Sequence, residues 1–330
     1  MDDDIIESLI AAVGEVLDTE LAGLASDRAA RNRTTLNRVL TSLGELGYLT
    51  AGSEDGSGLG LYADARLAAT LAESWGSLAW AALPTLLGNR LGEAEGYAPT
   101  ALAFPEPNTW SQAQLEGGTV TGELRFVLNA DSATRVLAVS PSGAAVMASI
   151  AKRRESGDSV EGFSETIHDS VFLAPDGAAV TGELVSAVRI LRASIACGLA
   201  AGAISLGVRY AQERVQFGHP IGVYGEIRSI VARAAGLHRS AQALVDQVAR
   251  AWDAGSRSDA DAAQALLVAV ENSTIAIERM QHVHGGYGQM AEFEIGRYMR
   301  DVRIVGAFDA SLPSLEDIVA DDFGLPRFSS

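Results

Sequence analysis

The chain has 330 residues, of which 48% are hydrophobic, and it carries a formal net charge of -17 at pH 7. That length allows two or three domains with a large core, and the negative charge argues against nucleic acid, whose phosphates need a concentrated basic face. No apolar run approaches the roughly 20 residues that span a bilayer, and the acidic start MDDDIIESLI is unlike an export signal. We therefore expect a cytoplasmic protein that binds neither nucleic acid nor membrane.

The first part of the chain has the periodicity of helices. Apolar residues recur at three-and-four spacing in residues 5–17, 36–49 and 64–83. The loop SEDGSGLGL, which lies between the second and third of these segments, breaks the pattern with closely spaced glycines. The sequence therefore predicts an N-terminal helical domain over residues 1–99.

In the middle of the chain the period changes to two. Residues 119–130, 134–150 and 165–175 alternate or contain runs of β-branched side chains, with glycine and proline between them. This pattern is typical of strands, and we predict a small β domain over residues 100–182.

The last part of the chain returns to helical periodicity. Residues 184–214 form one long apolar segment, an apolar stripe follows between Ile227 and Val248, and a third helix is expected over residues 262–283. Long helices with short links indicate a helical bundle over residues 183–330. Cys197 is the only cysteine. Because it stands among small residues, we interpret it as a buried thiol.

Two motifs in the predicted bundle combine glycines with charged and aromatic residues. In YAQERVQFGHPIGVYGEI, residues 210–227, the helix is expected to end near Phe217. Either Arg214 is a solvated side chain at a helix corner, or it meets an anionic ligand while Phe217 covers an aromatic one. Taken alone, this motif favours the solvated side chain.

The second motif is MQHVHGGYGQMAEFEIGRYMRD, residues 280–301. Gly285 and Gly286 permit backbone angles that other residues resist, and they expose amides to a close ligand. Gln281 and His282 lie about one turn earlier and could hydrogen-bond that ligand. A metal site is not expected, because no Asp, Glu or Cys joins the histidines at ligand spacing.

Together these motifs resemble the C-terminal signature of the acyl-CoA dehydrogenase family. The segments that carry the resemblance are RVQFGHPI, QHVHGGYG and RYMRDVR, preceded in the family's order by the weaker matches GELGYLTAGSEDGSGLGL, ALAFPEP, TVTGELRFVLNAD and SETIHDSVFLAP. The resemblance implies a fold that is mainly α with a small β domain: an N-terminal helical domain, a middle β-barrel-like domain and a C-terminal four-helix bundle. Such chains usually assemble as tetramers.

The resemblance also implies FAD as cofactor, an acyl-CoA thioester as substrate and an electron-transfer protein as acceptor. By position, Arg214 and Phe217 would contact the FAD of a neighbouring subunit, and Gly285 and Gly286 would line its pyrophosphate. His282 stands where the family has a glutamine. The physical interpretation agrees, since glycine amides and an arginine are what a diphosphate requires.

The catalytic base that the resemblance implies is Asp309, within RDVRIVGAFDAS at residues 300–311. The family commonly has a glutamate there, which removes the proton α to the thioester. An aspartate is one methylene shorter, a deficit of about 1.5 Å, and a misplacement near 1 Å can cost roughly 100-fold in rate. Asp309 is therefore either the base or a loop or cap carboxylate before Ser311, and both interpretations stay open.

Positions that the family uses for the chain's own flavin ring depart further from its pattern. Pro105 replaces a threonine, and Phe126 and Leu128 stand in a tryptophan–x–threonine motif, where Leu128 has no hydrogen-bond donor in its side chain. Gly225 replaces a glutamine near the adenine. The positions that would serve a partner's FAD diphosphate are better kept.

This asymmetry predicts a subunit of an acyl-CoA dehydrogenase-type oxidoreductase that completes the FAD site of another acyl-CoA dehydrogenase-like chain in a homo- or hetero-oligomer. Two alternatives remain. The chain is a self-sufficient flavoenzyme with Asp309 as base, or it is a flavin-free structural or binding protein that keeps the fold.

Overall fold

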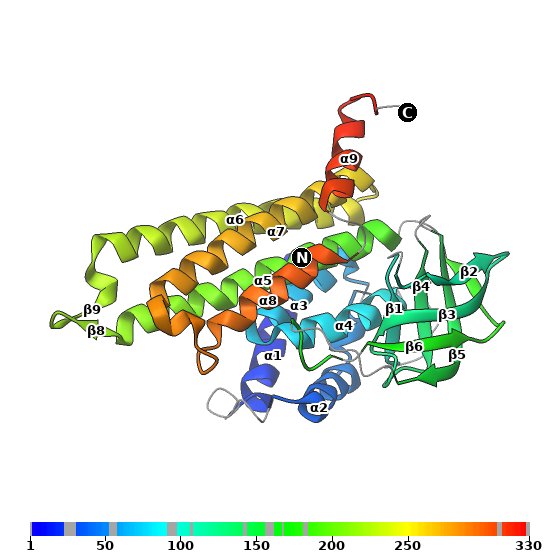
Figure 1. Ribbon diagram of the computed structural model, residues 1–330, viewed down its shortest axis with the longest axis horizontal. Coiled ribbons are helices and arrows are strands. Elements are labelled where there is room, and N and C mark those ends of the chain that lie inside the picture. Colours follow the sequence, from blue (N-terminus) through cyan, green and yellow to red (C-terminus); the bar gives the residue numbers. More distant parts are fainter. Residues whose placement is uncertain are drawn as a thin grey trace.

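The computed structural model describes residues 2–22, 31–52, 58–90, 98–105, 108–140, 144–155, 162–166, 168–180, 184–308 and 312–327. Four helices come first, a β-sheet follows, and long helices complete the chain (Figure 1). The predicted fold class, mainly α with a small β domain, is confirmed. The sheet lies at one end of the molecule, and the long helices extend away from it.

The N-terminal helices are α1 (Asp2–Glu20), α2 (Arg33–Glu45), α3 (Gly60–Ser74) and α4 (Gly76–Asn89). The single helix expected over residues 64–83 is in fact α3 and α4, because Trp75 between them has an extended backbone. The carboxylate of Asp253 accepts hydrogen bonds from the amides of Leu61 and Tyr62 at 2.7 and 2.8 Å. This cap at the start of α3 comes from a long C-terminal helix, and it ties the two helical regions together.

The sheet closes into a barrel. Its strands are β1 (Thr100–Ala103), β2 (Gln112–Glu116), β3 (Thr119–Leu128), β4 (Arg135–Val139), β5 (Ala145–Arg154), β6 (His168–Leu173) and β7 (Ala178–Val180). Strands pair in the order β1-β4-β5-β6-β3, and β3 returns to β1 where Leu128 faces Leu102. Strand β2 pairs with β3, and β7 pairs with β5. Closure removes most of the free sheet edges that would otherwise invite aggregation.

The bundle is built from α5 (Leu184–Glu213), α6 (Gly225–Asp253), α7 (Asp259–His284) and α8 (Ile295–Ala307), and α9 (Leu312–Asp322) projects from the body (Figure 1). Helix α5 is central, because it packs against α3, α4, α6, α7 and α8. Short elements join the helices at the end of the bundle away from the barrel: β8 (Val215–Gln216), β9 (His219–Pro220), the 3-10 turn Ile221–Val223 and the 3-10 turn η4 (Gly285–Gln289).

Helix α5 is more apolar than the sequence pattern indicated. By length and composition alone it could cross a membrane, contrary to the expectation that no run would be long enough. However, 89% of its apolar window is buried inside the protein. The surrounding helices explain this composition, because a helix that is apolar on all sides fits the core of a large protein.

Gly198 on α5 is where the bundle meets the N-terminal helices most closely. A Cβ at this position would lie 2.1 Å from the backbone oxygen of Ala69 on α3. We expect Gly198→Ala to destabilise the protein by about 1–3 kcal/mol, because the two backbones would have to separate. In contrast, Gly236→Ala on α6 would meet nothing within 4 Å and is expected to stabilise by roughly 0.5–1 kcal/mol. Urea unfolding of both variants checks these opposite signs.

Candidate functional site

Arg214 follows directly after α5 and lies beside η4. The helix ends at Glu213, four residues earlier than expected. The Arg214 amide donates to the Tyr210 carbonyl at 2.8 Å, and its own carbonyl accepts from Ile221 at 2.8 Å. Its guanidinium stands 5.2 Å from the ring centre of Tyr287, a cation–π contact. Arg214, Phe217, Gly285, Gly286 and Tyr287 are called the bundle-end site below.

Phe217 forms the tip of the β8–β9 hairpin. Phe217 and Gly218 both have positive φ, 54° and 84°, as a two-residue hairpin turn requires. A phenylalanine in this conformation is strained, and its side chain is 92% exposed. The Tyr224 hydroxyl braces the hairpin by donating to the Gln216 carbonyl at 2.9 Å. The hairpin is therefore held in place while its aromatic tip is presented to solvent.

The paired glycines end α7 and face open space. Gly285 has φ 59° and ψ -137°, a conformation that strongly favours glycine. A Cβ built at Gly285 or Gly286 would meet no heavy atom within 4 Å. The backbone here is uncovered, so a ligand can approach its amides closely.

The polar side chains around the glycines differ in their contacts and in their exposure. Gln281 donates through Nε2 to the Gly288 carbonyl at 3.0 Å, so it braces η4 instead of facing a ligand as predicted. His284 is buried, stacks on Tyr210 at 4.3 Å and places Nδ1 2.8 Å from the Met280 carbonyl. Burial lowers the pKa of His284. His282 is exposed, on the surface of the last turn of α7.

Metal ligands do not gather at this end of the bundle. Within the described ranges there is no group of three or more His, Cys, Asp or Glu residues that could hold a metal ion. His284 is buried and His282 is exposed, so the two imidazoles lie in different surroundings.

The two residues predicted to lie at the chain's own flavin ring have different environments. Leu128 is fully buried, and it pairs across the sheet with Leu102 on one side and His168 on the other. Phe126 is half-buried with φ 53°, at a bulge in β3 where the register with β6 shifts. The Leu128 side chain is therefore part of the core, and the prediction that it contacts the ring is not supported by this placement.

Four aromatic side chains meet where α4, the barrel and the end of α8 come together. Trp80 stacks on Phe163 at 4.7 Å and on Phe104 at 5.5 Å, and Phe308 lies 4.8 Å from Phe104. Trp80, Phe104 and Phe163 are fully buried, and His168 of β6 stacks on Phe308 at 6.2 Å. The junction cluster is defined as Trp80, Phe104, Phe163 and Phe308. The side chains of these four residues fill the space at this junction. Asp309 follows Phe308 directly but lies outside the described residues.

Asp301 fixes the junction cluster to α8. Its Oδ1 accepts a hydrogen bond from the Phe163 amide at 2.7 Å, whereas Oδ2 is enclosed and has no partner among the described residues. Burial raises the pKa of Asp301 to about 7, although the nearby Arg297 and the Phe163 amide act to lower it. Because the pKa is higher in the folded than in the unfolded state, the unfolded chain releases this proton first. The contribution of Asp301 to stability therefore falls as the pH rises from about 4 to about 7.

We expect Asp301→Asn to reduce the loss of stability between about pH 4 and about pH 7, because an asparagine oxygen still accepts from the Phe163 amide without a proton to release. Thermal unfolding midpoints across this range measure the effect. Burial also raises the pKa of Asp64 to about 7, so the slope becomes smaller without disappearing. Glu271→Gln on the exposed side of α7 serves as the control. An unchanged slope in Asp301→Asn would show that this carboxyl is ionised throughout.

Part of the chain matches a known protein family. Residues 175–319 match the family described as acyl-CoA dehydrogenase, C-terminal domain. Over 135 residues, 41% of this chain and 34% of the relative, the sequence is 34% identical to acryloyl-CoA reductase (NADH) of Anaerotignum propionicum. The chain spans about a third of the length of the curated relatives that it matches.

Solved structures match over almost the whole chain. Butyryl-CoA dehydrogenase from Megasphaera elsdenii superposes with a TM-score of 0.83 at 19% identity, covering 98% of both chains. A variant of the Tcur3481–Tcur3483 steroid ACAD gives a TM-score of 0.76 at 20% identity, covering 98% of this chain and 100% of that one. These likenesses show the fold. Residues 175–319 therefore match the acyl-CoA dehydrogenase C-terminal domain, and the whole chain has the fold of these enzymes.

Members of the acyl-CoA dehydrogenase family are oxidoreductases that bind FAD. In this chain the residues at the two corresponding regions differ. At the bundle-end site, the uncovered backbone of Gly285 and Gly286 and the guanidinium of Arg214 suit a diphosphate. On the barrel side, Leu128 is enclosed in the core and offers no donor. The chemistry of the bundle-end residues therefore suits a diphosphate, whereas the Leu128 side chain offers a flavin ring no hydrogen-bond donor.

Several residues of these two regions were not found by sequence reasoning. Tyr287 supports Arg214, and Tyr224 braces the hairpin, yet each stands in the sequence as an ordinary aromatic near a glycine. The members of the junction cluster are far apart in the chain and follow no common period. Among these, only Tyr287 had a usable signal, since it adjoins the paired glycines.

Proposed function

We propose that this chain is an acyl-CoA dehydrogenase family member and the less-equipped subunit of a two-chain, FAD-dependent enzyme that dehydrogenates an acyl-CoA thioester between its α and β carbons. Its bundle-end site completes the FAD site of a partner chain of the same fold. The partner contributes the surface for the flavin ring and the catalytic carboxylate, and an electron-transfer protein accepts the electrons.

The main support for this proposal is the contrast between the bundle-end site and the barrel side of this chain. At the bundle end, the phenyl ring of Phe217 is exposed and the backbone of the paired glycines is uncovered, with the guanidinium of Arg214 held beside them by Tyr287. Where α4, the barrel and α8 meet, the buried rings of Trp80 and Phe163 stack on each other. A chain that serves only a partner's cofactor would keep the first arrangement and would need no open space at the second.

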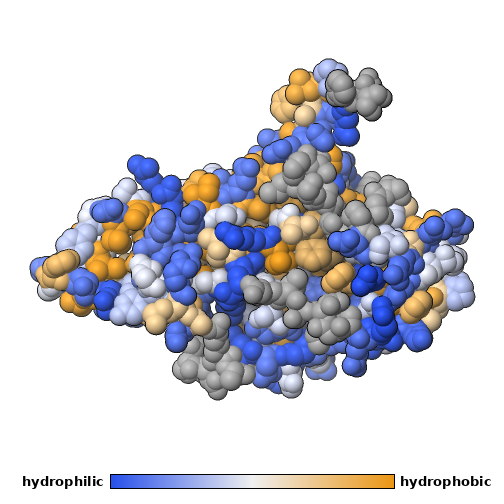
Figure 2. Space-filling model, viewed as in Figure 1, coloured by the Kyte–Doolittle hydropathy of each residue, from blue (hydrophilic) through white to orange (hydrophobic). Residues whose placement is uncertain are grey.

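Apolar surface near the bundle end supports contact with another chain. Val215, Phe217 and Val223 are 53%, 92% and 56% exposed, and a groove of about 320 Å³ between α5 and α6 is lined largely by apolar side chains, including those of Ile227 and Val231. Figure 2 shows hydrophobic side chains reaching the surface along the α6–α7 side of the molecule. Exposed apolar patches of this kind mark protein interfaces. We infer that α6 packs against another protomer.

In such an enzyme, bound FAD supplies the hydride acceptor for the β carbon of the thioester. The residues of this chain act on the other end of the cofactor. Arg214 and the glycine amides hold the diphosphate by charge-assisted hydrogen bonds, and Phe217 shields the cofactor from water. The similar steroid ACAD structure carries two designations in its name, Tcur3481 and Tcur3483, which supports a division of labour between unlike chains.

The colour of the purified protein tests this assignment. We expect the chain expressed alone to be colourless, and the chain co-expressed with a family member that keeps the complete motifs to co-purify with it and carry flavin. Yellow protein from this chain alone, reducible by an acyl-CoA, would instead establish a self-sufficient flavoenzyme. Absence of flavin under both conditions would leave a structural or binding protein of this fold.

Asp309→Asn separates the two enzymatic interpretations. In the co-expressed assembly we expect turnover to stay within about twofold of the unmodified enzyme, because the partner supplies the carboxylate. If Asp309 were the base, the rate would fall by roughly 100-fold or more. Steady-state rates with an acyl-CoA that the assembly oxidises give the answer, and the corresponding substitution of the partner's carboxylate is the positive control.

A further inference from the structure

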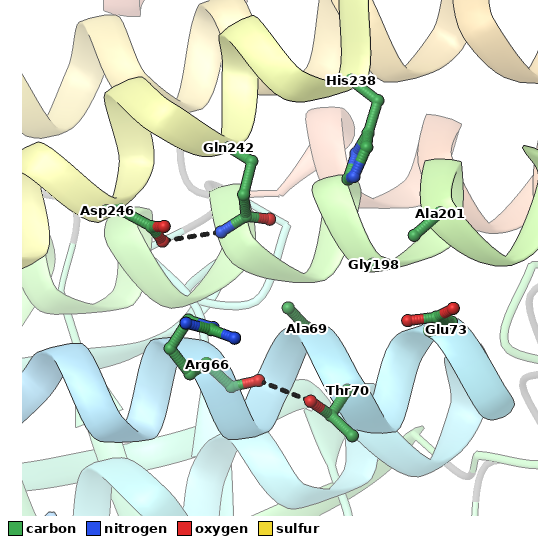
Figure 3. A pocket seen from close by; sticks show the side chains of 9 residues that line it. All are labelled: Arg66, Ala69, Thr70, Glu73, Gly198, Ala201, His238, Gln242 and Asp246. Carbon is green, nitrogen blue, oxygen red and sulfur yellow. Dashed lines mark hydrogen bonds between the residues drawn. The ribbon is translucent and has the colours of Figure 1, made fainter. Parts of the chain in front are cut away.

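A polar cavity of about 290 Å³ lies between α3, α5 and α6 (Figure 3). It shares no lining residue with the bundle-end site or the junction cluster, so the proposed function leaves it unused. Its volume is near the lower end of small-molecule pockets, which run from roughly 300 to 1,000 Å³. Its polar lining comes from two helices: Arg66, Thr70 and Glu73 from α3, and His238, Gln242 and Asp246 from α6.

The two carboxylates of the cavity stand toward opposite ends of it, with Ala69 between them in the view of Figure 3. Asp246 accepts a hydrogen bond from Gln242 Nε2 at 2.7 Å. Burial raises the pKa of Asp246, although Gln242 and Arg66 act to lower it. Glu73 lies at the rim, where burial alone raises the pKa of its carboxyl. Within the described part of the chain, no hydrogen bond or ion pair engages its side chain. Both carboxylates would therefore gain from a cation in the cavity.

Small apolar residues separate these two ends. Ala69 of α3 and Gly198 and Ala201 of α5 line the middle of the cavity. They offer no hydrogen-bonding side chain, and they leave a narrow apolar surface on which methylene groups can lie. A cavity with two polar ends and an apolar centre matches a ligand that has a polar group at each end and an apolar middle.

The charge balance favours a cationic ligand. Arg66 is the only cation among the lining residues, and its Nη1 is bonded to Glu7 Oε1 of α1 at 2.7 Å. Among the lining residues, the carboxylates of Glu73 and Asp246 face the single guanidinium of Arg66, while Arg250 outside the lining also acts on Asp246. Burial lowers the pKa of His238, and the adjacent Arg239 adds to this effect, which keeps the imidazole neutral.

We propose that this cavity binds a linear aliphatic diamine. One protonated amine pairs with Asp246, the other pairs with Glu73, and the methylene chain lies over Ala69 and Ala201. One ammonium group meets each carboxylate, and the ligand displaces water from the apolar middle of the cavity.

Calorimetric titration of the purified chain tests the ligand class, and it needs neither flavin nor a partner chain. The probes are 1,4-diaminobutane and 1,6-diaminohexane, with n-butylamine as the single-charge comparison. We expect at least one diamine to bind at least about tenfold more tightly than butylamine, because two charge-assisted contacts form instead of one. Absence of binding by both diamines, or equal affinity for butylamine, would overturn the proposal.

Charge-removing variants test the position of the ligand. We expect Glu73→Gln and Asp246→Asn each to weaken diamine binding by about tenfold or more. Glu278→Gln on the exposed face of α7 is the matched control and should leave affinity unchanged. Because Glu73 is at the rim and holds no other residue, its variant is expected to fold normally even if Asp246→Asn does not. Unchanged affinity in Glu73→Gln would show that the ligand does not span the cavity as proposed.

Discussion

Replacing Arg214 by alanine is expected to release FAD from the assembly of this chain with its partner. The guanidinium lies beside Tyr287 and the uncovered glycine turn, where it can bind phosphate oxygens through two parallel hydrogen bonds. Hydrogen bonds to charged groups contribute roughly 1.5–3 kcal/mol each. Loss of the fork should therefore weaken FAD binding on the order of a hundredfold or more. Flavin retained after dialysis, measured with the flavin affinity by fluorescence, checks this result.

Two further variants serve as comparisons for Arg214→Ala. Arg214→Lys keeps the charge and loses the planar fork, so it should restore only part of the affinity. Arg209→Ala removes an exposed arginine of α5 and should leave flavin content unchanged. Size-exclusion chromatography establishes that each variant still assembles. Full flavin content in assembled Arg214→Ala would contradict the role of the bundle-end site.

The sequence predicted the long helices and the glycine turn for clear physical reasons. Three-and-four periodicity over many residues leaves little ambiguity for α6 and α7, and a pair of glycines before an aromatic marks a helix end. The prediction that Arg214 and Gly285 belong to one site came from family resemblance, because no local pattern brings the end of α5 to the end of α7. In the structure, the contact of Arg214 with Tyr287 shows that these two segments adjoin.

Other features depend on contacts that the sequence does not display. The break between α3 and α4 falls at Trp75, directly before Gly76, and the extended backbone of Trp75 is visible only in the fold. Closure of the barrel depends on the pairing of Leu102 with Leu128, two residues with no mutual signal. Leu128 was assigned to the flavin ring by position in a motif, whereas its burial is decided by both neighbouring strands.

Trp80→Ala is expected to destabilise the chain by about 3–5 kcal/mol, the usual cost of deleting a large buried aromatic side chain. Trp80 is fully buried and contacts the rings of Phe163, Phe104 and Phe308, so its removal leaves a cavity where the N-terminal helices, the barrel and α8 meet. Its Nε1 is enclosed without a hydrogen-bond partner in the described part of the chain. Trp80→Phe therefore sacrifices no hydrogen bond and should cost less than about 1.5 kcal/mol. Urea unfolding of both variants measures the difference.

The same variants show whether the junction cluster is structural or catalytic. If the cluster only closes this chain's unused half-site, Trp80→Phe should leave the turnover and flavin content of the assembly unchanged, because the reaction proceeds in the partner. If the junction were the chain's own active site, a smaller ring beside the end of α8 would alter the Michaelis constant or the rate with little change in stability. A kinetic effect of Trp80→Phe without destabilisation would thus refute the assignment of catalysis to the partner chain.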